Sequence, residues 1–529
     1  MTNFIKMKRR KFLRTAGLTT AMAPFVYNGF SIHPMARNSF FSTLGAAAQL
    51  NDRVMVFIEL TGGNDGLNTL IPLDQYATLA SHRSTLLIPE NKVLGLDGTD
   101  ATGLHPAMTE LQGLYNDGLL SIVQNVGYPN QDYSHFRSMD IWQTASGSGE
   151  HLETGWLGRT LEGEYPGFPN GYPNADNPDP LAIQIGSITP IALMGSAFPM
   201  GMSISDPDSF YEFVNDLTEP TPATPYGDEL AYIQLVMQQS QQYYGVIKNA
   251  AESSQNLSSK YPPDYENPLA DQLKVAARLI GGGLQTPVYL VFIGGFDTHS
   301  EQVSGPGSTD TGNHAQLLHQ ISQAICAFQD DITLMGMAGK VCGMTFSEFG
   351  RTIASNGSLG TDHGAAAPLF VFGQGVNPGI IGANASIPAV LPESADVPMQ
   401  HDFRSVYASV LQDWFGIENW DSILFDNFDI LPIFKSATPT RQVYPDAFSV
   451  GNYPNPVISG ATITFTSTNA HVAINLLDGQ GRFLRNIAEG NYPAGPQKVQ
   501  FSRGSLPSGA YYYQVRMNGV AVTKKMLVM

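Results

Sequence analysis

From Asp52 to about Phe434 the sequence alternates short apolar segments with segments of helical periodicity. This alternation is typical of a mostly parallel β-sheet with helices on both faces. The clearest strands are expected over 54–60, 119–126, 288–293 and 341–346, and the first of them is nearly all apolar, as a strand buried on both faces should be. We therefore predict an α/β domain over residues 50–435, with functional side chains where its strands end.

Carboxylates and imidazoles recur where these expected strands end. Glycine-rich turns follow two of the strands, and a further apolar strand is expected over 368–373. An Asp-Gly turn alone explains a single aspartate, so each motif is weak by itself. Oxygen and imidazole ligands together suit zinc-like divalent ions. The recurrence predicts a metal site at one sheet edge, with these candidate ligands: Asp65, Asp297, His299, Glu348, Asp362 and His363.

Ser134 begins a segment in which Phe136, Met139 and Trp142 recur at helical spacing. It is therefore the expected N-cap of a helix, where free N–H groups and the helix dipole stabilise a bound anion. Most serines at this position only cap the helix, so both roles stay open. The catalytic candidates are Ser134 and the adjacent His135.

The chain of 529 residues is longer than one hydrophobic core usually organises, so a second domain is expected. Residues 436–447 begin with the linker-like sequence Ser-Ala-Thr-Pro-Thr-Arg. After them, over 448–529, short alternating strands are separated by turn residues. This pattern predicts a small C-terminal β-sandwich.

The formal net charge of −18 excludes an extended nucleic-acid footprint, because no cluster of Lys and Arg occurs beyond the N-terminus. Only Cys326 and Cys342 are present, so the fold does not depend on a disulfide framework.

Residues 1–45 are expected to be an export signal and leader. A basic segment over 6–14 contains Arg9-Arg10 before Phe12-Leu13, and a moderately apolar segment follows to Ile32. Polar residues, proline and glycine interrupt that segment, so no transmembrane anchor is expected. The segment resembles a twin-arginine signal, and a general secretory signal is the alternative.

The last eighty or so residues contain an ordered set of motifs: Tyr453-Pro-Asn-Pro, Leu477-Asp-Gly-Gln-Gly-Arg, and Leu506-Pro-Ser-Gly-Ala-Tyr. This set resembles the type A C-terminal sorting domain of type IX secretion. The resemblance implies the secretion machinery as a partner and passage through the periplasm to the cell surface or the medium. A carbohydrate-binding or spacer sandwich is the alternative. Type IX cargo usually enters by the general secretory route, which conflicts with a twin-arginine signal.

The ordered motifs of the central domain resemble domain-of-unknown-function family 1501. They are Gly-Gly-Asn-Asp-Gly-Leu-Asn, Ser-His-Phe, Gly155-Trp-Leu-Gly-Arg159, Gly-Gly-Phe-Asp-Thr-His, Ser-Glu-Phe-Gly-Arg and Gly-Thr-Asp-His-Gly. The family is placed with the alkaline phosphatase and sulfatase superfamily, whose members use two metal ions and a Ser, Thr or Cys nucleophile. The resemblance implies that Asp65 is the first-strand metal ligand, that Ser134 is the nucleophile, and that Asp297 and His299 are the middle ligands. His314 is a rival of His299.

The last motif fits the superfamily in two registers. Asp362 and His363 are an adjacent ligand pair, or Glu348 takes the place of that aspartate and His363 is the final histidine. We favour the second register, which leaves Phe349 where a metal-binding histidine is expected.

The leading hypothesis is an exported metal-dependent hydrolase of phosphate or sulfate esters, with one or two divalent ions, zinc being the candidate. The alternative is a non-catalytic surface binding or assembly protein on a degenerate scaffold of the same fold.

Overall fold

The computed structural model describes residues 51–207, 242–392, 395–435 and most of 450–528. It also describes two short paired strands, β1 (Phe25–Tyr27) and β2 (Phe30–Ile32). The twin-arginine-like motif and the expected linker over 436–447 lie outside the described residues.

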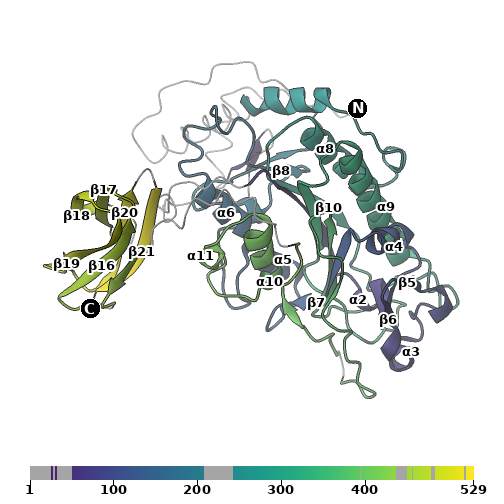
Figure 1. The fold of residues 1–529 in the computed structure, drawn as a ribbon. Helices are drawn as coiled ribbons and strands as arrows, with labels where there is room; N and C mark the ends of the chain where they lie inside the picture. Colours follow the sequence, from purple (N-terminus) through teal and green to yellow (C-terminus); the bar gives the residue numbers. More distant parts are fainter. Residues whose placement is uncertain are drawn as a thin grey trace.

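A nine-stranded sheet organises the larger part of the described chain (Figure 1). Every neighbouring pair in it is parallel except for β12, which runs antiparallel to both β11 and β7. The prediction of a mostly parallel α/β sheet is confirmed. In spatial order the strands are β13 (Gly379–Ile381), β7 (Leu120–Gly127), β12 (Ala367–Gly373), β11 (Val341–Phe346), β3 (Val54–Thr61), β10 (Val288–Gly294), β8 (Ala182–Ile185) and β9 (Met202–Ile204), and β14 (His401–Asp402) pairs with β7.

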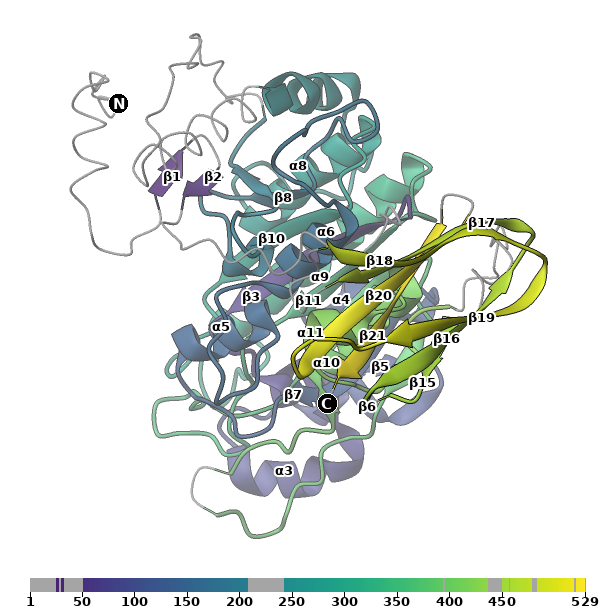
Figure 2. The same cartoon turned by 90° about the vertical axis from the view of Figure 1, so that its left-hand side faces the viewer.

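Helices cover both faces of this sheet because its central strands are apolar on both sides (Figures 1 and 2). On β3, Val56 and Ile58 face one core, while Met55 and Phe57 face the other. The first core is covered by α4 (Thr109–Asn116), α8 (Pro268–Gly281) and α9 (Asn313–Leu334). The second is covered by α5 (His135–Thr144), α6 (Trp156–Glu164), α10 (Phe403–Ser409) with the π-helix Val410–Trp414, and α11 (Trp420–Leu424).

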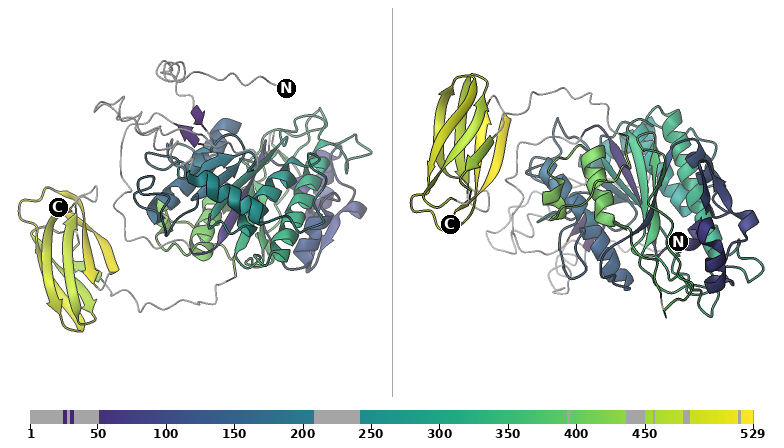
Figure 3. Two further views of the ribbon diagram at one scale, coloured as in Figure 1. Left: turned by 90° about the horizontal axis from the view of Figure 1, so that it is seen from above. Right: turned by 60° about the horizontal axis from the view of Figure 1, so that its bottom comes forward.

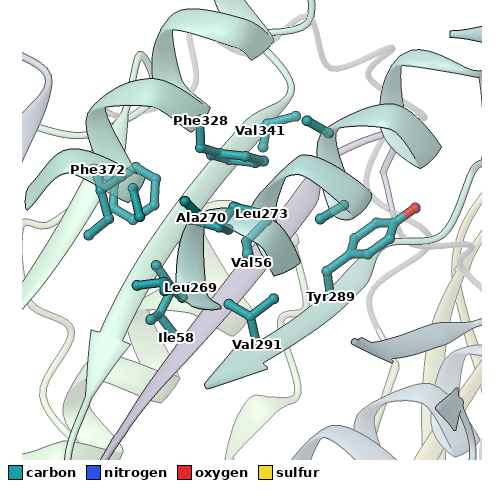
Figure 4. Close-up of a cluster of buried hydrophobic side chains, with 14 of the residues drawn as sticks. Val56, Ile58, Leu269, Ala270, Leu273, Tyr289, Val291, Phe328, Val341 and Phe372 are labelled. Carbon is teal, nitrogen blue, oxygen red and sulfur yellow. The ribbon is translucent and has the colours of Figure 1, made fainter. Parts of the chain in front are cut away.

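Figure 4 shows how the first core is packed. Leu269 and Leu273 of α8 and Phe328 of α9 lie against Val56 of β3 and Val291 of β10. All five side chains are at most 1% exposed. Burying an aliphatic or aromatic side chain of this size contributes roughly 1.5–3 kcal/mol, so this layer contributes substantially to the stability of the sheet.

Smaller elements complete this part of the chain. They are α2 (Gly66–Thr69), α3 (Tyr76–Arg83), a three-stranded sheet of β4 (Leu70–Pro72), β6 (Thr99–Leu104) and β5 (Leu94–Leu96), and 3-10 turns at Leu73–Gln75, Glu90–Lys92 and Ile191–Leu193.

Seven strands in the described C-terminal residues form two antiparallel sheets, drawn as a body of their own in Figure 3. Alternate side chains such as Ile463, Ile474 and Tyr513 share one buried core between the sheets. The predicted β-sandwich is confirmed. One sheet consists of β15 (Val450–Tyr453), β16 (Gly460–Ser467) and β19 (Gly495–Ser502), and the other of β18 (Phe483–Tyr492), β17 (Ala470–Leu477), β20 (Gly509–Met517) and β21 (Val520–Val528).

Candidate metal centre

The direction of β12 explains how side chains far apart in sequence meet. Asp297 and His299 follow β10, so they lie at the carboxyl edge of the parallel strands. His363 precedes β12, and because β12 is antiparallel to β11, its beginning lies at that same edge. His135 is the first residue of α5, which follows β7.

Asp297 stands at the middle of this group. Its Oδ1 lies 3.2 Å from His299 Nε2 and 3.3 Å from His363 Nε2, and its Oδ2 lies 3.5 Å from His135 Nε2. The two nitrogens His299 Nε2 and His363 Nε2 are 2.8 Å apart. One ligand atom each from His135, Asp297 and His363 lies within 4.8 Å of the other two. Three imidazoles and one carboxylate therefore converge.

The Nδ1 atoms of two of these imidazoles are engaged outside the group. His363 Nδ1 donates to the backbone carbonyl oxygen of Tyr133 at 2.7 Å, and His299 Nδ1 donates to Asp362 Oδ1 at 3.1 Å. A carbonyl oxygen can only accept, so the proton of neutral His363 is on Nδ1 and its Nε2 carries a lone pair. Such outer partners are typical of metal-binding histidines.

His135 has the same arrangement. Its Nδ1 lies 2.8 Å from Glu348 Oε1, which also accepts from the backbone N–H of Gly62 at 2.8 Å. Glu348 is completely buried. The Nε2 of His135 is thereby left facing Asp297, as in the other two histidines.

These donors fit a zinc-like ion. Ligand atoms of a tetrahedral zinc site, about 2.0–2.1 Å from the metal, lie roughly 3.3 Å from one another. The separations of 3.2 and 3.3 Å from Asp297 Oδ1 to His299 and His363 are close to that value, and His135 lies 3.5 Å from the other oxygen, Oδ2. His299 Nε2 and His363 Nε2 are closer, at 2.8 Å, the distance of a hydrogen bond from one imidazole to the other, so binding an ion would require these two rings to move apart by about 0.5 Å.

Arg351 supplies the fixed positive charge of this edge. Its side chain is fully buried, and its Nη2 donates to Asp297 Oδ1 at 2.8 Å. Burial alone would raise the pKa of Asp297, but the guanidinium outweighs it and lowers that pKa below its ordinary value. Asp297 is therefore an anion at neutral pH.

Arg351 also joins three loops. It donates to the backbone oxygens of Gly62 and Gly63 after β3, of Phe296 after β10, and of Thr361 before β12. Two of these loops carry Asp297, His299 and His363, so one guanidinium holds three of the four converging residues in place.

Glu348 and Asp362 lie beside Nδ1 atoms rather than among the converging Nε2 atoms. Burial raises the pKa of Asp362, but hydrogen bonds from Asn356 and His299 bring it below its ordinary value. In this geometry both carboxylates orient histidines. Neither of the two sequence registers describes that role.

Asp65 is not part of the converging group. Both of its oxygens accept from Arg83 Nη1 at 2.9 Å, and Gln302 Nε2 donates to its Oδ2 at 2.6 Å. The carboxylate is 1% exposed, and Arg83 outweighs burial to lower its pKa. His314 lies near this pair, with its Nε2 3.0 Å from Asn64 Oδ1, so it does not compete with His299 for the centre.

Phe349 occupies the place where the resemblance expects a histidine. It is 1% exposed, and its ring centroid lies 4.9 Å from that of His135 and 4.6 Å from that of His363. An apolar ring thus supports two of the imidazoles and offers no ligand.

Ser134 is the N-cap of α5, as predicted, and is exposed. Its side chain makes no capping hydrogen bond, while its backbone N–H donates to Asp132 Oδ1 at 2.8 Å. In the chain it stands between Tyr133, whose carbonyl holds His363, and His135.

Sequence reasoning missed Tyr133 and the role of Arg351. Arg351 was visible as the last residue of Ser-Glu-Phe-Gly-Arg, an arginine that directly follows an apolar strand and its turn. Tyr133 acts through its backbone carbonyl, for which no side-chain pattern gives a signal.

Fold and centre together define an α/β protein with a candidate metal centre at the carboxyl edge of a mostly parallel sheet. Residues 52–424 match the family described as protein of unknown function, DUF1501. The chain belongs to this family. Residues 452–529 match the secretion system C-terminal sorting domain, which indicates export to the cell surface or secretion. Both resemblances are confirmed.

Several solved structures are similar at low identity. One is a Bacteroides thetaiotaomicron protein described with the metabolism of multiple glycosaminoglycans, at 9% identity and a TM-score of 0.35, covering 85% of this chain and 90% of that one. Another is the PsFucS1 sulfatase of Pseudoalteromonas sp., at 11% identity and a TM-score of 0.31, covering 85% of this chain and 84% of that one. A third is the lipoteichoic acid synthase LtaP of Listeria monocytogenes, at 11% identity and a TM-score of 0.31, covering 83% of this chain and 89% of that one. No curated protein matches the sequence.

Among the described residues, no helix combines the length and apolar character that a membrane span requires.

Proposed function

We propose that this protein is an exported metal-dependent hydrolase of phosphate or sulfate esters. The observation that carries the proposal is the convergence of three Nε2 atoms on Asp297, with each Nδ1 engaged by an outer partner. A divalent ion at such a centre supplies a Lewis acid that polarises the oxygens of a bound ester. The sorting domain supports export.

We propose one ion rather than two. Asp297, Glu348 and Asp362 contribute three negative charges and Arg351 one positive charge, with the imidazoles neutral. One divalent ion neutralises this sum, and a second would leave two uncompensated positive charges in a partly buried site. Imidazole nitrogens make zinc the leading candidate.

Ser134 is the proposed nucleophile. It is exposed, uncommitted as a cap, and next in sequence to His135. The first-turn N–H groups of α5 lack partners within the helix and would stabilise negative charge that develops on the transferred group.

The test uses the purified full-length protein. Its metal content is measured by mass spectrometry, and its activity on a panel of phosphate monoesters, phosphodiesters and sulfate esters. We expect about one ion per chain and turnover of at least one ester class, both lost in His363→Ala. His471→Ala, an exposed histidine of the sorting domain, is the matched control and should behave as the parent. Absence of metal and of all turnover in the parent would contradict the proposal.

The second candidate is a surface binding or assembly protein. The apolar Phe349 against two imidazoles and the Asp65–Arg83 ion pair favour it, since both replace ligands that the resemblance implies. A parent protein that binds the ion and a polysaccharide, yet turns over no ester, would support this candidate.

A further inference from the structure

Tyr133 contacts two separate parts of the chain near the metal centre. Its backbone carbonyl accepts from His363 Nδ1 at 2.7 Å, and its phenol donates to Asp396 Oδ2 at 2.5 Å. The ring is 47% exposed. Burial in a core therefore does not hold this residue, whereas both hydrogen bonds tie it to other segments of the chain.

Asp396 is itself attached to the segment 351–363, which carries Asp362 and His363. It pairs with Thr352 in an isolated antiparallel bridge, and the neighbouring Ile353 N–H donates to the Ala395 carbonyl at 2.9 Å. The Thr352 N–H donates to the Asp362 carbonyl at 3.0 Å. The contacts of Tyr133 thus close a ring that passes through Asp396 and the segment 351–363.

The direction of the hydrogen bond between the two side chains follows from their chemistry. A carboxylate can only accept, so the phenol of Tyr133 is the donor and Asp396 Oδ2 the acceptor. A hydrogen bond to a carboxylate is roughly twice as strong as one between neutral groups.

We infer that Tyr133 and Asp396 are positioning residues: their hydrogen bond fixes the loop before α5 on segment 351–363 and thereby places Ser134 and His135 against Asp297. The inference rests on the metal centre proposed above. It assigns a function in the centre to a loop whose residues contribute no ligand atom.

The experiment compares Tyr133→Phe with the full-length parent. This variant loses only the hydroxyl and keeps the ring and the backbone carbonyl. We expect zinc affinity, measured by competition with a chelator, to fall about tenfold or more, the range typical of outer-shell partners. In the metal-free protein, amides 133–137 should exchange several-fold faster with deuterium.

Variants of the partner make the test specific. Asp396→Ala should match Tyr133→Phe, and the double variant should be no weaker than either, because both remove one bond. Asp396→Asn keeps an acceptor oxygen and should restore most of the affinity. Tyr76→Phe is the control, since it removes a phenol that donates to the Ile88 carbonyl away from the centre.

Parent-like affinity and exchange in Tyr133→Phe would overturn the inference, as would additive losses in the double variant. If the parent binds no zinc, the proposed function fails, and the exchange rates of the metal-free proteins still decide whether Tyr133 fixes the loop.

Discussion

Glu348 directs the His135 imidazole from a completely buried position. We expect Glu348→Gln to lower zinc affinity about tenfold, because the amide keeps an acceptor for Gly62 N–H but loses the charge that stabilises the His135 ligand. Chelator competition measures this. Glu252→Gln, at an exposed helix position, is the control, and equal affinities in the two variants would refute the role of Glu348.

Glu59 gives a pH dependence of stability that can be tested by one substitution. Burial, with repulsion from Glu348, raises its pKa from 4.5 to about 7, despite hydrogen bonds from Thr61 and Gln143. The folded state therefore binds this proton more tightly than the unfolded state does. The protonated Glu59 carboxyl therefore contributes to the free energy of unfolding fully below pH 4.5, and this contribution is lost as the pH rises through about 7.

Glu59→Gln removes this dependence. Relative to the parent, the variant should gain roughly 1–3 kcal/mol in free energy of unfolding above pH 7, and the gain should vanish near pH 4. Urea denaturation at both pH values measures the difference. A gain that is equal at both would mean that packing, not ionisation, is responsible.

At the scale of elements, the loop after β3 depends on one glycine. Gly62 has a φ of +123°, and a Cβ there would lie 2.4 Å from Asp297 N. Gly62→Ala should thus push the loop after β3 away from the loop that carries Asp297 and His299, costing on the order of 1–3 kcal/mol in strain and weakening zinc binding. Gly283 has a φ of +95°, but a Cβ added there would meet nothing within 4 Å. Gly283→Ala should therefore lower stability without changing zinc affinity. Equal zinc affinity in both variants would contradict this account.

The strands and helices of the central domain could be predicted because their burial requires apolar residues at regular spacing in the local sequence. The apolar segments 54–60 and 288–293 became β3 and β10, and helical spacing located α5. The antiparallel direction of β12 could not be predicted in this way, because it depends on which strands β12 pairs with in the fold.

Part of the candidate site could be predicted from the sequence, namely the residues that follow or precede the strands. Strand ends indicated Asp297, His299 and His363, which do converge. Asp65 looked equivalent, but Arg83, 18 residues later, pairs with it in the fold. The placement of Glu348 beside His135 depends on contacts 213 residues apart in the chain, which spacing alone does not encode.

At the scale of the molecule, the described residues form two separate groups of hydrophobic clusters. Buried clusters between Val54 and Phe434 surround the large sheet, and a separate cluster between Val457 and Val528 fills the sandwich. Their buried residues do not overlap. The candidate metal centre and the sorting domain therefore lie in units with their own buried cores, so each unit should be removable without unfolding the other.

This separation predicts two transitions in calorimetry of the full-length protein. A chain ending at residue 435 should lose one transition and keep the other within a degree or two, with unchanged zinc stoichiometry. In cells the shortened chain should accumulate in the periplasm, because it lacks the segment that matches the sorting domain. Fractionation of cells expressing both forms measures this. A single transition that shifts on truncation would show that the units stabilise each other, and surface display of the shortened chain would remove the sorting role from residues 452–529.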